Sequence, residues 1–136
     1  MPLYRTLTEP ELDRVTAGIA LARRLAGSEG VPSATEIQAL YDVLLQDLNG
    51  ADAAIEALGY AFGTLFFQQD WLHWAMMLDD EFGDEVAVVV QDRALGCSPM
   101  SIIRNRLQDG EACDLAELAA STVSRLRQLG QQAPPA

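Results

Sequence analysis

The fold class is decided by residues 71–91, which read WLHWAMMLDDEFGDEVAVVVQ. Residues 71–78 are too continuously apolar for a surface helix, and residues 85–91 contain four valines, a residue type enriched in strands. The intervening segment 79–85 holds five acids and one glycine, which is typical of a turn. The stretch therefore predicts an antiparallel β-hairpin.

Side-chain alternation predicts which residues of this hairpin share a face. A turn centred on Phe82 makes every pair apolar, whereas a slip by one residue mixes the two faces. The predicted pairs are Leu78 with Val86, Met76 with Val88 and Trp74 with Val90. The core face then carries Leu72, Trp74, Met76 and Leu78, and the opposite face carries Trp71, His73, Ala75 and Met77. A short third strand within 93–97 completes a predicted β-meander.

Helices are predicted on both sides of the meander, because apolar residues recur there at steps of three and four. The first stripe begins at Leu12. Residues with N-cap chemistry precede four of the helices: Thr8, Ser33, Ser98 and Asp114. The chain is therefore predicted to be α+β, with N-terminal helices, a small antiparallel meander at about 71–97, and two C-terminal helices packed on one sheet face. We treat 1–129 as a single domain and expect 130–136 to be a disordered tail.

Two glycines, Gly59 and Gly63, lie one turn apart in the third predicted helix, which spans about 51–68. Each costs roughly 1 kcal/mol relative to alanine in an exposed helix interior. We expect close approach of another backbone to compensate, in a small-residue seam against the second helix or the sheet. A ligand lying across the glycines is the alternative.

The charge of the chain is concentrated in one segment. The sequence has 136 residues, 20 acids, nine arginines and no lysine, and a formal net charge of −11. Residues 25–92 contain thirteen acids and no base, whereas each flanking segment carries a net charge of +1. This balance argues against sequence-independent nucleic-acid binding, which needs a basic face. It fits either a solvated surface or an acidic face presented to a basic partner.

The sequence also predicts the cellular compartment of the protein. No apolar run approaches the roughly 20 residues of a membrane helix, and no apolar segment follows a basic start, so neither a membrane span nor a secretory signal is expected. Cys97 and Cys113 match no metal-binding spacing and are expected to be free thiols. We therefore expect a cytoplasmic protein, and the sequence leaves its oligomeric state open.

Candidates for catalysis are few. His73 is the only histidine, so a paired-histidine metal site is excluded, and we expect it to be an ordinary strand residue. Cys97 precedes a capped helix, a position that lowers a thiol pKa. Six residues separate Cys97 from Arg104, however, one more than the Cys-x5-Arg loop of tyrosine phosphatases has, and Pro99 removes a backbone donor. We therefore expect neither a catalytic residue nor a cofactor.

The acidic turn 79–85 is the remaining chemical candidate. A solvated turn, a contact for a basic partner and a metal site are all compatible with it, although the alternating ligand pattern of a calcium-binding EF-hand is absent. Aromatic side chains rimmed by charge are common in interfaces, so the turn and the aromatic end of the hairpin are expected to form one patch. The predicted partner-binding residues are Trp71, His73, Asp79, Asp80, Glu81, Asp84 and Glu85.

Several of these residues together resemble a bacterial family, the domain of unknown function numbered 3806, over about residues 55–120. The resemblance rests on Leu58-Gly59, Phe62-Gly63, Trp74, Gly83, Pro99, Ile103, Arg106 and Asp114-Leu115. It implies an α+β fold and brings neither an assigned activity nor catalytic residues.

Two hypotheses of different class follow. The first is a small acidic interaction protein without catalytic machinery, in its sharpest form an immunity- or antitoxin-type inhibitor that binds and neutralises a basic protein. The second is a small-ligand-binding or enzymatic module with a pocket between the third helix and the sheet.

Overall fold

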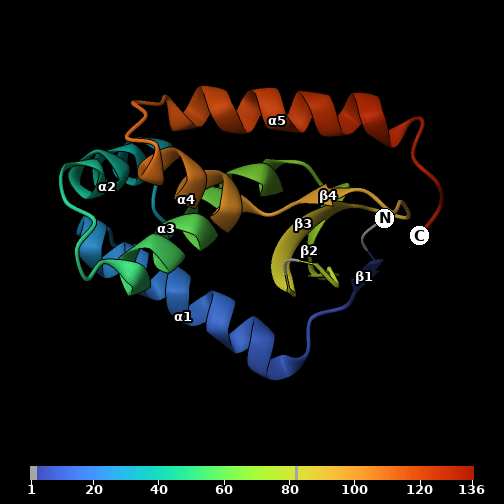
Figure 1. Cartoon of the computed structure of the whole chain (residues 1–136), viewed down its shortest axis with the longest axis horizontal. Coiled ribbons are helices and arrows are strands. Elements are labelled where there is room, and N and C mark those ends of the chain that lie inside the picture. The colour runs from blue at the N-terminus through green and yellow to red at the C-terminus, as the bar shows by residue number, and fades with distance from the viewer. Residues whose placement is uncertain (1–2, 82) are drawn as a thin grey trace.

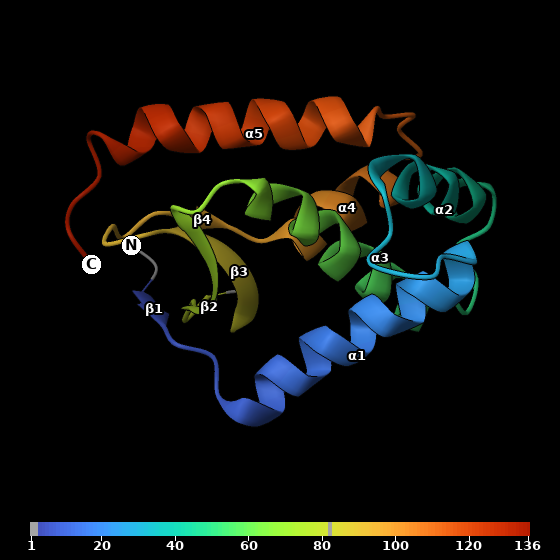
Figure 2. The same cartoon turned by 180° about the vertical axis from the view of Figure 1, so that it is seen from behind.

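The computed structural model describes residues 3–81 and 83–136, and it confirms the α+β class (Figure 1). The helices are α1 (Glu9–Ala26), α2 (Ala34–Gln46), α3 (Asp52–Thr64), α4 (Pro99–Gln108) and α5 (Leu115–Gly130), with a 3₁₀ turn η1 (Leu65–Gln68) after α3. The strands are β1 (Leu3–Arg5), β2 (Leu72–Leu78), β3 (Glu85–Val90) and β4 (Gly96–Cys97). In both views α5 and α1 lie on opposite sides, with α3 and α4 between them, the sheet at one end and α2 at the other (Figures 1 and 2).

The sheet is antiparallel, in the order β1-β2-β3-β4. It contains the predicted meander, whose third strand is limited to two residues. The sequence analysis missed β1, which pairs with the end of β2 through Leu3 and Leu78. Three residues are too few to show a period, so no pattern in the sequence marks this strand.

The predicted register of the hairpin is wrong by two residues. Met76 pairs with Val86 and Trp74 with Val88, so the pairs centre on Glu81. Phe82, the predicted centre, lies outside the described residues. A shift of two preserves the alternation of faces, so the apolar pattern cannot distinguish the two registers. The observed register leaves Leu78 beyond the last pair with β3, where it pairs with β1 instead.

The predicted caps are confirmed. Thr8 and Ser33 each form a full capping box, and the side chains of Ser98 and Asp114 accept hydrogen bonds from the first turns of α4 and α5. Leu12 was expected in the buried stripe of α1 but is 48% exposed. In the structure described for residues 3–81 and 83–136, no helix combines the length and the apolar character needed to cross a membrane.

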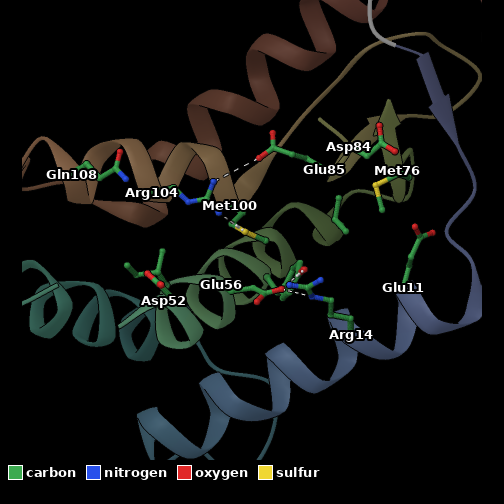
Figure 3. Close-up of a pocket in the computed structure, with 13 residues that line it drawn as sticks. Glu11, Arg14, Asp52, Glu56, Met76, Asp84, Glu85, Met100, Arg104 and Gln108 are labelled. Atoms are coloured by element: carbon green, nitrogen blue, oxygen red, sulfur yellow. Dashed lines mark hydrogen bonds and ion pairs between the residues drawn. The ribbon is translucent and has the colours of Figure 1, made fainter. Parts of the chain in front are cut away.

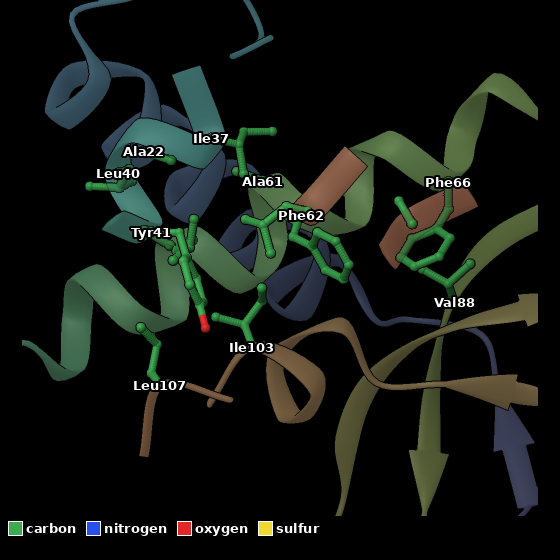
Figure 4. Packing of buried hydrophobic residues seen from close by; sticks show 14 of the residues in the cluster. Ala22, Ile37, Leu40, Tyr41, Ala61, Phe62, Phe66, Val88, Ile103 and Leu107 are labelled. Atoms are coloured by element: carbon green, nitrogen blue, oxygen red, sulfur yellow. The ribbon is translucent and has the colours of Figure 1, made fainter. Parts of the chain in front are cut away.

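The main core lies between the helices and one face of the sheet. Its largest fully buried side chains include Tyr41 of α2, Phe62 of α3 and Ile103 of α4, which converge from three helices (Figure 4). Val88 and Val90 contribute the sheet's side of this core. Helices therefore pack on one sheet face, as predicted.

The glycines of α3 do mark a close approach, but its partner is mainly α4. A Cβ atom on Gly59 would lie 2.8 Å from the backbone Cα of Met100. A Cβ on Gly63 would meet the Trp74 ring and Pro99. The expected partners were α2 or the sheet: the sheet is confirmed at Gly63 through Trp74 of β2, whereas α4 takes the place of α2. The sequence analysis could not identify α4, because the spacing of small residues says nothing about which element packs there.

The C-terminal residues 130–136, which composition predicts to be a disordered tail, include residues that pair with the β3–β4 loop. The backbone N–H of Ala94 donates to the carbonyl of Pro134 (3.0 Å), and that of Ala136 donates to the carbonyl of Asp92 (3.2 Å). Arg93 and Pro135 form an antiparallel bridge. The disordered tail stays a prediction from composition, which takes no account of backbone pairings with the β3–β4 loop.

Candidate functional site

A cleft of about 540 Å³ opens between α3, α4, α1 and the turn end of the hairpin (Figure 3). This is the place where the sequence analysis put a pocket in its second hypothesis, between the third helix and the sheet. Thirteen residues line the cleft, and seven of them carry a charge.

The two long walls of the cleft come from helical spacing. Asp52, Glu56 and Tyr60 follow one another at steps of four along α3, and Met100, Arg104 and Gln108 do the same along α4. Residues four apart lie on the same helix face. Eight residues of helix span about 12 Å, so the cleft is an elongated groove rather than a round cavity.

The floor of the groove is apolar. Met76 and Val86, which are a cross-strand pair, close it at the hairpin, and Ile55 and Met100 contribute from the helices. Tyr60 lines the groove from α3, and its ring meets the Trp74 ring edge-on at 6.3 Å between centroids. The floor therefore offers apolar contact to the stem of a ligand.

One long side carries the ion pair between Arg14 of α1 and Glu56 of α3. The Nε atom of Arg14 lies 2.6 Å from Oε1 of Glu56, which also accepts a hydrogen bond of 3.0 Å from the Tyr60 hydroxyl. The hydrogen bond from Arg14 is the main reason that the pKa of Glu56 is lowered. Burial first, and then the neighbouring Glu56 carboxylate, raise the pKa of Tyr60 to about 12. Glu56 is therefore ionised and Tyr60 neutral at physiological pH.

The other long side carries Arg104 and Glu85. Their charged groups approach to 3.9 Å, and Arg104 also donates to the Met100 sulfur at 3.0 Å. Both carboxylate oxygens of Glu85 accept from the Ser101 hydroxyl, at 2.7 and 2.9 Å. Glu85 is thereby tied to α4.

Glu11 stands at the end of the groove nearest β1 and is also paired. Arg5 donates two hydrogen bonds to its carboxylate, at 2.7 and 2.8 Å. This contact, followed by the hydrogen bond from the Thr8 backbone, lowers the pKa of Glu11 to about 2. The pair also joins β1 to the start of α1.

Two carboxylates of the groove have no such partner. Within residues 3–81 and 83–136, neither Asp52 nor Asp84 takes part in a side-chain hydrogen bond or an ion pair, although Arg5 acts on Asp84 at longer range. Figure 3 shows them at opposite ends of the cleft, with the Arg14–Glu56 and Arg104–Glu85 contacts between them. The unpaired negative charge therefore lies at the two ends of the groove.

The structure divides the predicted acidic turn. Asp84 and Glu85 line the groove, whereas Asp80 and Glu81 are exposed outside it. Asp79 shapes the turn: its side chain accepts from the Glu81 backbone N–H at 2.8 Å, and its carbonyl accepts from that of Gly83 at 2.9 Å. The predicted partner-binding residues thus contribute two side chains to the groove.

Trp71 and His73 do not join this patch. They lie at the opposite end of β2 from the turn, and a seven-residue strand separates its ends by about 20 Å. Trp71 precedes the strand, packs against the main core and lies 5.4 Å below the guanidinium of Arg127. His73 is exposed on the sheet face that the helices leave uncovered in the described residues. The predicted strand 71–78 already places Trp71 and His73 near its start and the turn after its end, so the expectation of one patch overlooked the length of the strand.

The cysteines and a metal site were the other chemical candidates. Burial raises the pKa of the Cys97 thiol to about 11, which is the reverse of activation at a helix N-terminus. Both cysteines are free. Across the residues that the structure describes, no group of three or more His, Cys, Asp or Glu side chains is arranged to hold a metal ion.

The charged groove residues outside the hairpin were not predicted as site residues from the sequence: Glu11, Arg14, Asp52, Glu56 and Arg104. The sequence does contain a pattern that marks these residues. Charged residues at steps of four on α3, and a methionine, an arginine and a glutamine at the same step on α4, mark helix faces that are only partly buried. That these faces meet is decided by the tertiary fold.

The comparisons with known proteins define the class of the chain. A family model described as "Domain of unknown function (DUF3806)" matches residues 35–118. This match covers more than half of the chain, and it confirms the expected resemblance. The protein belongs to this family. The matched segment includes α3, the hairpin and α4, but not α1, so the wall carrying Glu11 and Arg14 lies outside it.

A solved structure supports the fold. A protein from Bacteroides thetaiotaomicron VPI-5482, solved at 1.50 Å, is similar with a TM-score of 0.73 and 16% sequence identity. The similarity covers 91% of this chain and 48% of that chain, so the present chain spans about half the length of that protein. At this identity the likeness concerns the fold alone. No curated protein matches the sequence.

Proposed function

We propose that this protein is an interaction module that binds a basic protein partner through the acidic groove and the adjoining turn. The observation that carries the proposal is the charge of the groove. Five carboxylates and two guanidinium groups line it, which gives a formal charge of −3 over an apolar floor. An apolar centre with a charged rim is a common composition for a binding surface.

The charge of the whole molecule supports this reading. The net charge of −11 comes from residues 25–92, and this segment supplies four of the five groove carboxylates as well as the exposed turn. A concentrated negative field accelerates association with a positively charged partner. In the sharpest form of this proposal, the protein is an immunity- or antitoxin-type inhibitor and its partner is a basic toxin.

A peptide pair tests the proposal. A fluorescent nonapeptide of glycine and serine with four arginines is titrated against the protein, beside the same peptide with citrulline, an uncharged isostere, in place of arginine. We expect the arginine peptide alone to bind, and its affinity to fall as salt rises from about 20 to 200 mM, because salt screens exposed charges. Equal binding of the two peptides, or no binding of the arginine peptide at low salt, contradicts the proposal.

A matched pair of variants separates a local surface from the general charge of the protein. Glu81→Lys with Asp84→Lys should weaken binding of the arginine peptide. Glu29→Lys with Asp70→Lys changes the net charge equally, at two exposed positions outside the groove, and should weaken it less. Equal losses from the two double variants would show that only the net charge matters.

A small-ligand-binding module is the second candidate. The observation in its favour is the volume of the groove, about 540 Å³, which falls within the range of small-molecule sites. Saturable binding of a small uncharged metabolite, insensitive to salt and lost in Tyr60→Phe or Met100→Ala, would favour this candidate over the first.

A further inference from the structure

The groove also indicates what kind of basic segment it accepts, an inference that rests on the proposed function. Its two long sides carry negative charges that arginines of the chain already offset: Arg14 pairs with Glu56, and Arg104 lies beside Glu85. Glu11 is held by Arg5. Of the five carboxylates that line the groove, only Asp52 and Asp84 have neither an ion pair nor a side-chain hydrogen bond among the described residues, and they stand at opposite ends (Figure 3).

The ligand must therefore carry positive charge at two separated points. One lysine or arginine reaches one end of a groove about 12 Å long, and its alkyl stem lies over the floor between Met76 and Met100. A second cation is needed to reach the other end. A length of 12 Å corresponds to roughly four residues of extended chain, and side chains four apart point the same way.

The polar group on the α4 wall favours a polypeptide over a free polyamine. The carboxamide of Gln108 lines the groove and makes no hydrogen bond within residues 3–81 and 83–136. A carboxamide both donates and accepts, as a peptide backbone does, whereas a polyamine offers donors only. The existing ion pairs leave the groove accessible, because Arg14 and Arg104 are 71% and 42% exposed and such pairs are weak.

We infer that the groove binds an extended segment of the partner in which two basic residues are separated by three residues, about 13 Å along the chain, with one basic side chain directed to Asp84 and the other to Asp52. If the bound segment runs in the opposite direction, the two basic side chains exchange places, and Asp52 and Asp84 remain their binding sites. Neutral residues between and beside the two cations face the solvent or Gln108.

Two peptides of identical composition test this inference on the full chain. Acetyl-Gly-Arg-Ser-Gly-Ser-Arg-Gly-amide has arginines four apart, and acetyl-Gly-Arg-Arg-Ser-Gly-Ser-Gly-amide has them adjacent. Titration of ¹⁵N-labelled protein is followed by the backbone signal of Met100 and the side-chain amide signals of Gln108, with the indole signal of Trp71 as a distant control. We expect the first peptide to bind about fivefold more tightly, the advantage of one additional exposed charge contact.

Variants place the two contacts. Asp52→Asn and Asp84→Asn should each remove the preference between the two peptides, whereas Glu29→Gln with Asp70→Asn should preserve it. Equal affinity for the two peptides, or a preference that survives both groove variants, overturns the inference. Spermidine that binds more tightly than either peptide assigns the groove to free polyamines and overturns it as well.

The outcomes distinguish the inference from the proposed function. Binding of the four-arginine peptide at the exposed turn, with unchanged signals from Met100 and Gln108, overturns the two-point site and leaves the interaction module standing. Absence of binding by the four-arginine peptide at low salt removes both.

Discussion

Two neighbouring regions between α3 and α4 are built in opposite ways. At Gly59 the helices approach so closely that a methyl group would lie 2.8 Å from the Cα of Met100. On the next face of the same helices, from Asp52 to Tyr60, the walls separate and leave a charged groove of about 540 Å³. Met100 belongs to both regions: its Cα, Cβ and Cγ atoms face Gly59 in the seam, and its side chain also lines the groove. Packing at the seam sets the distance between α3 and α4. The groove can therefore carry unpaired carboxylates, because the packing of these two helices does not depend on contacts inside the groove.

The largest expected effect breaks the seam. Gly59→Ala should lower the free energy of unfolding by about 1–3 kcal/mol, because overpacking against a backbone atom outweighs the helix propensity that alanine gains. Urea denaturation followed by circular dichroism measures this loss.

Gly30→Ala is the matched control, because no heavy atom lies within 4 Å of the position that the new Cβ would take. It should be neutral or stabilising by up to about 1 kcal/mol. A neutral Gly59→Ala would show that the seam can move apart and that the groove width is not fixed by it.

A smaller effect on the free energy of unfolding is expected at the ion pair between Arg14 and Glu56, on one long side of the groove. Glu56→Gln removes the pairing with Arg14 but keeps a group that can accept from the Tyr60 hydroxyl. Because Arg14 is largely exposed, the free energy of unfolding should fall by about 0.5 kcal/mol. The pKa of Tyr60 should also fall, since the adjacent carboxylate is one of the groups that raise it. Alkaline absorbance titration of wild type, Glu56→Gln and their Tyr60→Phe counterparts isolates this shift, and an unchanged Tyr60 titration would contradict the assigned contact.

The pair at the β1 end of the groove predicts a dependence on acid. The pKa of Glu11 is about 2 in the folded protein, against an ordinary value of 4.5, and the Arg5 contact is its main cause. A lowered pKa stabilises the fold fully above pH 4.5, and this stabilisation is lost as the pH falls towards 2. Across this window wild type should therefore lose more stability than Arg5→Gln does. Urea denaturation at several pH values measures the difference, and parallel losses in the two proteins would show that the contact does not stabilise the fold.

The smallest effect on stability is expected inside the groove. Asp84→Asn should change the free energy of unfolding by less than about 0.5 kcal/mol, because Asp84 has no hydrogen bond or ion pair to lose in the described part of the chain. A slight gain is expected from reduced repulsion with its acidic neighbours. Thermal and urea denaturation provide the measurement, and a loss above 1 kcal/mol would show that the groove is a structural element after all.

Local signals in the sequence predicted much of the fold. Thr8 and Ser33 lie at the predicted helix starts because a capping box is a local pattern of four residues. The hairpin faces were predictable because alternation has a period of two. Its register was not, since Met76 opposite Val86 and Met76 opposite Val88 satisfy the same alternation. β1 and the C-terminal bridge were missed because both depend on backbone pairing with distant residues.

The candidate site shows the same division. Asp84 and Glu85 were found from the sequence because five acids in seven residues are conspicuous. Asp52, Glu56 and Arg104 were not found, since each is an ordinary charged residue on a helix until the packing of α3 against α4 makes them neighbours.

The sequence by itself determined the α+β class, the helix starts and the concentration of negative charge between residues 25 and 92. These properties depend on local hydrogen bonding, on periodicity and on composition, all of which can be counted along the chain. Only the tertiary structure decided that Gly59 meets α4 and that Asp52 and Asp84 face one groove. The physical reason is that these relations join residues far apart in the chain, and their geometry follows from how the core packs.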